Sequence, residues 1–144
     1  MDLDDELTGL CRRVAAAAEI TVPLRDRPDL RQVRTAVMEA LTFGAHPADN
    51  FGGVLLVMDE LVSNAYRHTS AVRRLRVTRA AGTFLIEVSD HDPVVHQVRA
   101  REFGCGAYGL RLVAQLSLDW GVRADSDGKV VWAIVPIGVR PSEM

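Results

Sequence analysis

In the first half of the chain, apolar side chains recur every three or four positions, the spacing that buries one face of a helix. Three segments share this spacing: 3–18, 29–43 and 48–68. Proline and glycine mark their ends, because Pro28 precedes the second segment, Gly44 follows it, and Pro47 precedes the third. The pattern predicts three helices before residue 70.

Elsewhere the apolar period is two, the spacing of strands with one buried face. Strands are predicted at 20–24, where Pro23 indicates a sheet edge, and on both sides of Ala81-Gly82, where Leu75 to Val88 alternate as a hairpin. After a predicted helix at 108–118, two further strands form a second hairpin: 120–124 and 130–135. Helices first and antiparallel strands later favour an α+β fold, a two-layer sandwich.

The chain has 144 residues, enough for one domain, and 48% of them are apolar. Its formal net charge of −2 provides no bulk attraction to nucleic acid or to anionic lipid. Cys11 and Cys105 lie far apart, without zinc-ligand spacing, and favour a reduced, cytoplasmic compartment. The acidic start, Asp2 to Glu6, differs from a secretory signal, and the apolar runs are too short to span a membrane.

A polar stripe on the third predicted helix is a candidate site. At 100° per residue, Glu60, Asn64 and Arg67 lie within about 60° of one another, beside the apolar arc. A carboxylate in this position can activate a hydroxyl, and an amide oxygen can bind Mg²⁺. The alternative is an ordinary polar stripe on a helix.

Asp90 ends an apolar strand face. Alternation places it on the same side as Phe84, Ile86 and Val88. A carboxylate there must be exposed, paired, or held for a ligand donor such as an exocyclic amine. The alternative is an aspartate that begins the turn at His91.

The segment from Gly104 to Gly109 could bind phosphate, because glycines allow close backbone approach and a helix begins beside them. Its spacing also matches the dinucleotide fingerprint, with Asp125 further on. The preceding segment 97–102 is too charged for the buried parallel strand of that fold.

Two other clusters have plainer explanations. His91 and His96, with Asp90 and Asp92, lack metal-ligand spacing, which favours a solvated loop. Four arginines alternate with apolar residues on one strand, which favours a solvent-facing side of the sheet over a site for an acidic partner or nucleic acid: Arg73, Arg74, Arg76 and Arg79.

Taken in order, these segments resemble the GHKL superfamily of gyrase, heat-shock chaperone, histidine kinase and mismatch-repair ATPases. The motifs are Glu60-Leu-Val-x-Asn64-Ala-x-Arg-His68, Val88-Ser-Asp90-x-Asp-Pro93 and Gly109-Leu-x-Leu-Val113, followed by Asp119-Trp-Gly-Val122 and Gly128-Lys-Val-Val-Trp132. The small anti-sigma factor and serine-kinase branch is the most similar. The resemblance spans about residues 20–136 and implies a Bergerat-type ATP-binding fold with a mixed, mainly antiparallel sheet. We expect an N-terminal helix at 1–19, the ATPase domain at 20–138 and a tail at 139–144.

The resemblance also implies roles for individual residues. Glu60 would be the catalytic base, Asn64 the Mg²⁺ ligand, and Asp90 the acceptor for the adenine amino group. The remaining nucleotide-binding residues would lie in the same motifs and in a lid over the triphosphate: Arg67, His68, Pro93, Gly104, Gly106, Gly109 and Leu110.

Three departures from the family pattern predict weakened ATP affinity. Asp92-Pro93 replaces an Asp-x-Gly-x-Gly motif, although the small regulators also vary there. Tyr108 replaces a residue that is often basic, and Val130 stands where a threonine hydroxyl often helps to bind adenine.

The function implied by the resemblance is that of an ATP-binding switch. Such a protein binds a sigma factor and phosphorylates Ser or Thr on an anti-anti-sigma (STAS-type) partner, without direct contact to nucleic acid or membrane. The apolar stripe of the predicted N-terminal helix must pack on its own sheet or against a second copy or partner, and the resemblance favours a homodimer. The alternatives are a non-catalytic ATP-binding regulator and an interaction module that has lost nucleotide binding.

Overall fold

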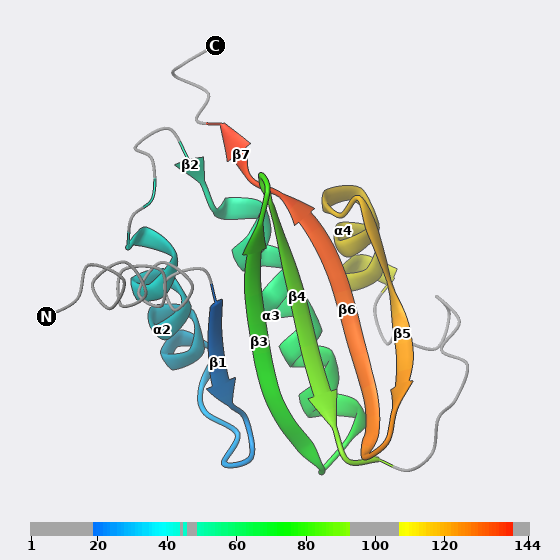
Figure 1. Ribbon diagram of the computed structural model, residues 1–144. Coiled ribbons are helices and arrows are strands. Elements are labelled where there is room, and N and C mark those ends of the chain that lie inside the picture. The colour runs from blue at the N-terminus through cyan, green and yellow to red at the C-terminus, as the bar shows by residue number, and fades with distance from the viewer. Residues whose placement is uncertain (1–18, 44, 46–48, 93–106, 140–144) are drawn as a thin grey trace, which may run out of the picture.

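The computed structural model describes residues 19–43, 45, 49–92 and 107–139. One five-stranded sheet has the order β1 (Glu19–Pro23), β3 (Val72–Ala80), β4 (Thr83–Asp90), β6 (Gly128–Pro136) and β5 (Asp119–Asp125). Helices cover one face of this sheet (Figure 1): α2 (Leu30–Thr42), α3 (Gly52–His68) and α4 (Ala107–Leu116). A two-stranded sheet joins β2 (Asp49–Asn50) to β7 (Gly138–Val139).

This architecture confirms the α+β two-layer fold. Every pairing in the described sheets is antiparallel, so the parallel component of a mixed sheet is not found among these strands. Strand β1 lies at the edge, as Pro23 predicted. The predicted N-terminal helix at 3–18 lies outside the described residues.

The third helix begins later than predicted. Residues 49 and 50 form β2 instead of helix, and α3 starts at Gly52. The Asn50 carboxamide oxygen accepts a hydrogen bond from the Gly52 N–H at 2.9 Å, a local contact that competes with helix at this position. Strand β7, which pairs with β2, was also missed, because two-residue strands have too few positions to show a period.

Local sequence chemistry fixes the start of α2. Asp29 is the N-cap residue, and its side chain accepts a hydrogen bond from Arg31 N at 2.7 Å. The Gln32 side chain in turn accepts from Asp29 N at 3.1 Å, which completes a capping box.

The β3–β4 hairpin turns at the predicted position. Ala81 and Gly82 have φ angles of 43° and 83°, and two positive values suit the tight turn that joins two twisted strands. The register then pairs Val77 with Ile86 and Leu75 with Val88.

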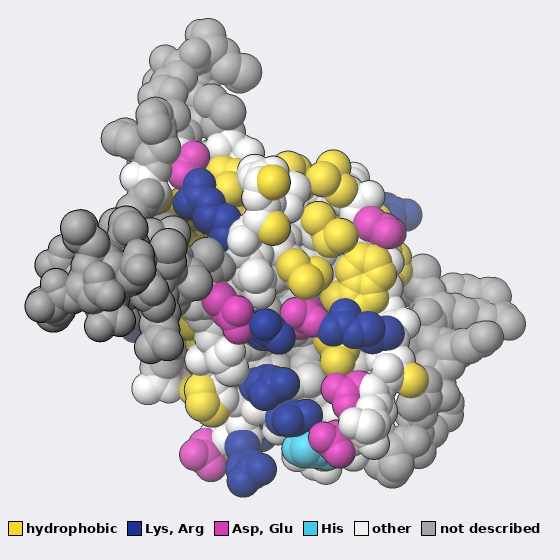
Figure 2. Space-filling model, in the orientation of Figure 1, with side chains coloured by type: hydrophobic (Ala, Val, Ile, Leu, Met, Phe, Trp, Pro, Cys, Tyr) yellow, Lys and Arg dark blue, Asp and Glu magenta, His cyan; other side chains and the backbone are white. Residues whose placement is uncertain are grey.

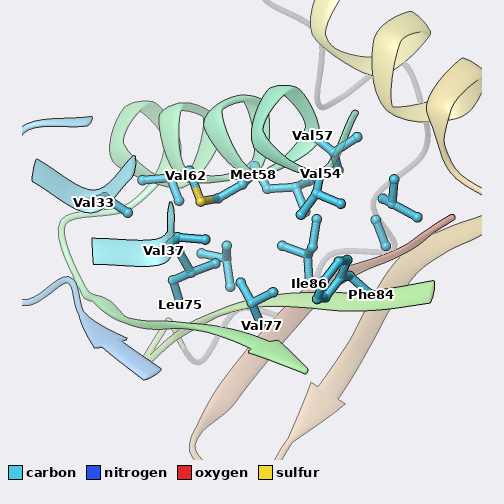
Figure 3. Close-up of a cluster of buried hydrophobic side chains, with 14 of the residues drawn as sticks. Val33, Val37, Val54, Val57, Met58, Val62, Leu75, Val77, Phe84 and Ile86 are labelled. Atoms are coloured by element: carbon cyan, nitrogen blue, oxygen red, sulfur yellow. The ribbon is translucent and has the colours of Figure 1, made fainter. Parts of the chain in front are cut away.

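The core lies between α3 and the central strands. Alternate residues of β3 and β4 point toward the helices, and Figure 3 shows them meeting the apolar side of α3. Phe84 is 1% exposed and contacts Phe51 edge to face, with ring centroids 5.8 Å apart. Burial of this alternating set orients β4 and therefore its last residue, Asp90.

The opposite face of the sheet carries charged side chains in pairs (Figure 2). Arg76 contacts Glu19 at 2.8 Å, and Arg123 contacts Glu87. Arg79 instead extends over the Phe84 ring and pairs with Asp49 at 3.2 Å. Acidic residues of the same domain therefore neutralise part of the arginine cluster.

None of the helices among the described residues is both long enough and apolar enough to span a membrane.

Phe84→Ala should lower the free energy of unfolding by about 3–5 kcal/mol, because it empties a buried aromatic site in the core. Leu85→Ala is the matched control on the other face of the same strand, where Leu85 is half-buried, and should cost clearly less. Urea denaturation measures both values, and equal losses would contradict this account of the core.

Candidate functional site

The last two turns of α3 carry the predicted polar stripe. Asn64 is 2% exposed, whereas Glu60 is half-buried and Arg67 and His68 are exposed. The Asn64 carboxamide oxygen accepts a hydrogen bond from the Arg67 guanidinium. Its amide nitrogen is buried and has no hydrogen-bond partner among the described residues.

An unsatisfied buried amide costs about 1–3 kcal/mol, so this environment is unfavourable for an asparagine with a purely structural role. The Asn64 amide nitrogen can thus donate a hydrogen bond to a ligand or to another group outside the described part of the chain. Glu60, one turn earlier, lies on the same side of the helix.

The Asp59 side chain points toward α2, unlike that of its neighbour Glu60. One Asp59 carboxylate oxygen lies 2.6 Å from the Arg34 guanidinium of α2. This pair links α2 to α3, and it leaves Glu60 as the carboxylate on the Asn64 side of the helix.

Asp90 ends β4 on the inner, helix-covered face, as predicted, and is 5% exposed. One carboxylate oxygen accepts a hydrogen bond from Asp92 N at 3.0 Å, and the other lies 2.8 Å from the Lys129 ammonium. Both sequence interpretations therefore hold in part, because Asp90 begins a turn and is also a buried acceptor that ends an apolar face.

Lys129 is the residue that sequence reasoning missed. In the β4–β6 register, Lys129 lies opposite Asp90, and Val130 lies opposite Ser89. Because side chains alternate along a strand, Val130 belongs to the outer face, away from the Asp90 side chain, and its effect on ATP affinity stays a prediction. The sequence did contain a sign that Lys129 faces inward, because it lies in phase with Val131 and Ala133, which are buried.

Gly128 brings the two strands together at this point. A Cβ atom on Gly128 would lie 2.1 Å from the Asp90 carbonyl oxygen, much closer than atoms can approach. Only glycine allows this contact, which holds the start of β6 against the end of β4.

The C-terminal end of α3 forms a basic surface pocket of about 430 Å³. Its lining runs from Tyr66 to Ser70 and includes Arg27. Arg27 donates hydrogen bonds to the carbonyl oxygens of Tyr66 and Thr69, and its guanidinium lies 4.6 Å from the centre of the Tyr66 ring. Burial raises the pKa of the Tyr66 phenol, and the charge of Arg27 partly offsets this effect.

Of the predicted lid residues, Gly109 and Leu110 lie in the first turn of α4, a helix that packs beside α3. Pro93, Gly104 and Gly106 lie outside the described residues. Within the described ranges, no three His, Cys, Asp or Glu side chains are grouped so as to hold a metal ion.

A model of the histidine kinase-like ATPase domain matches residues 22–135, which run from β1 into β6 and include every candidate residue discussed above. No curated protein matches this sequence.

Gly128→Ala should destabilise the domain by about 3 kcal/mol, because the added methyl group meets the Asp90 backbone. Gly82→Ala is the control. Gly82 has a positive φ but open space around it, so strain alone should cost about 1 kcal/mol. Urea denaturation gives both values, and a Gly128→Ala loss no larger than that of Gly82→Ala would show that β6 can move away from Asp90.

Proposed function

Because this chain belongs to the histidine kinase-like ATPase family, we propose that it is a regulatory protein that binds ATP between α3 and the end of β4. One observation carries the proposal. Two polar side chains, Asn64 on α3 and Asp90 on β4, are almost fully buried on the helix-covered side of the sheet, where the fold itself requires apolar residues.

The residues present fit the parts of Mg-ATP. The Asp90 carboxylate can accept a hydrogen bond from the adenine amino group. The Asn64 carboxamide oxygen is a suitable ligand for Mg²⁺, which usually takes one or two protein oxygens together with phosphates and water. A cation at this oxygen would replace the Arg67 guanidinium, which is then free to contact a phosphate.

The basic pocket provides the complement to the triphosphate. Arg67 both lines this pocket and reaches Asn64, so it connects the proposed metal ligand to the cationic surface. His68 and Arg27 add further donors there. Guanidinium groups bind phosphate oxygens through paired, charge-assisted hydrogen bonds.

Glu60 is the proposed general base. It lies one helical turn before Asn64, is half-buried, and has no part in the Arg34–Asp59 ion pair. Its carboxylate would accept the proton of an attacking Ser or Thr hydroxyl, whose oxygen then forms a bond to the terminal phosphorus as the bond to ADP breaks. Bound Mg²⁺ supplies charge neutralisation on the phosphates.

The finer proposal follows from the motif resemblance. We infer a serine or threonine kinase of the anti-sigma type, which binds a sigma factor and phosphorylates an anti-anti-sigma partner in the cytoplasm, and which forms a homodimer. The Glu60, Asn64 and His68 spacing supports this assignment. A non-catalytic ATP-binding regulator and an interaction module without nucleotide are the alternatives that experiment must separate.

Calorimetric titration tests nucleotide binding. The wild type should bind Mg-ATP, and Asn64→Ala should reduce the affinity at least tenfold, because it removes the proposed metal ligand. Asn50→Ala, at the other end of α3, should bind normally. Thermal melting must show that both variants are folded, and a wild type that binds no ATP would favour the interaction module.

Phosphoryl transfer separates the two remaining functions. With a panel of anti-anti-sigma proteins as acceptors, Glu60→Gln should keep its ATP affinity but lose about 10²-fold or more in transfer rate, the usual contribution of a general base. Glu39→Gln, an exposed change on α2, is the control. Transfer that is undetectable even with the wild type would favour the non-catalytic regulator.

A further inference from the structure

Lys129 is the only lysine of the chain, and it occupies an unusual position. It lies on the inner face of β6, in phase with the buried residues Val131, Ala133 and Val135, and its side chain is 14% exposed. Its ammonium lies 2.8 Å from one oxygen of Asp90 and 3.8 Å from Asp92.

The needs of the fold do not explain this ion pair. Removing two charges from water costs about as much as their attraction returns, and apolar residues of similar volume often give equal or greater stability. The rest of the inner face of β6 is apolar. The Asp90–Lys129 pair is therefore better explained by recognition of a ligand.

The pair combines an acceptor and a donor with unused capacity. A carboxylate has about four lone-pair sites, and contacts within the described residues use one on each Asp90 oxygen. An ammonium group has three donor hydrogens, and one of them is directed to Asp90. An acceptor and a donor thus lie side by side, 2.8 Å apart.

The hydrogen-bonding edge of adenine has the complementary order, with an amino donor next to the ring acceptor N1. We propose that Lys129 is a second base-recognition residue, which donates a hydrogen bond to N1 while Asp90 accepts one from the amino group. This inference rests on the proposed nucleotide function, and it assigns the base rather than the phosphates to the Asp90–Lys129 pair.

The backbone holds the order of the two groups. Gly128 fixes the strand that carries Lys129 against Asp90, and Asp92 N orients the Asp90 carboxylate. Guanine presents a carbonyl and a ring N–H in the reverse order, so it would oppose acceptor to acceptor and donor to donor. Lys129 should therefore add to the selection of adenine over guanine.

Three nucleotides test the wild-type protein by calorimetry. These are ATP, 1-deaza-ATP, which lacks the N1 acceptor, and purine riboside triphosphate, which lacks the amino group. Each analogue should bind about tenfold or more weakly than ATP, the usual effect of losing a hydrogen bond to a charged group. Equal affinities for ATP and 1-deaza-ATP would overturn the role of Lys129 and leave ATP binding intact.

Variants show which side chain reads N1. Lys129→Met should bind ATP and 1-deaza-ATP equally, whereas Lys129→Arg, which keeps the cation, should retain discrimination. Arg123→Met removes the cation of another ion pair, on the outer face of the same sheet, and should discriminate as the wild type does. If Lys129 only orients Asp90, Lys129→Met will still prefer ATP over 1-deaza-ATP, and the inference fails.

A stability control keeps the result interpretable. Lys129→Met leaves the buried Asp90 without its cation and could unfold the domain. The double variant Lys129→Met/Asp90→Leu removes both charges and every polar side-chain atom of the pair, so it should fold and lose discrimination at both N1 and the amino group. Discrimination at N1 that persists in a folded double variant would also overturn the inference, whereas a wild type that binds no ATP would overturn the proposed function itself.

Discussion

The packing of α3 across β4 is the constraint on which the rest of the structure depends. The sheet is covered by helices on one face only, so the inner positions of β3, β4 and β6 beneath α3 must be largely apolar to form a core. Three polar residues interrupt the apolar layer between α3 and the sheet: Asn64 of α3, Asp90 of β4 and Lys129 of β6. The energetic cost of burying them is the reason for proposing this region as the site, independently of any family likeness.

Much of the fold and part of the site could be predicted because they depend on local periodicity. The change of period from helix to strand gave the fold class, and the Ala81-Gly82 turn located the central hairpin. Asp90 was recognisable as the residue that ends an apolar alternation, and Asn64 as a polar residue beside an apolar helix face. Their buried environments agree with that reasoning.

The features that were missed depend on contacts between distant segments. The pairing of β2 with β7 joins segments that lie far apart in the sequence, Asp49–Asn50 and Gly138–Val139, and no local pattern encodes it. Whether Lys129 or Val130 accompanies Asp90 depends on the register between β4 and β6. The close contact at Gly128 helps to fix that register, and the sequence shows only a glycine in a turn.

Charge at the end of α3 explains how a chain with a net charge of −2 could hold a triphosphate. The C-terminus of a helix carries partial negative charge from unpaired carbonyl groups, which repels anions. Here Arg27 donates to two of these carbonyls, Arg67 adds a cation on the surface, and His68 lies beside it. The helix end thus becomes compatible with phosphate through side chains rather than through its dipole. At the proposed base position, by contrast, Lys129 is paired with Asp90, so that this end of the proposed site holds an ion pair rather than an excess of cations.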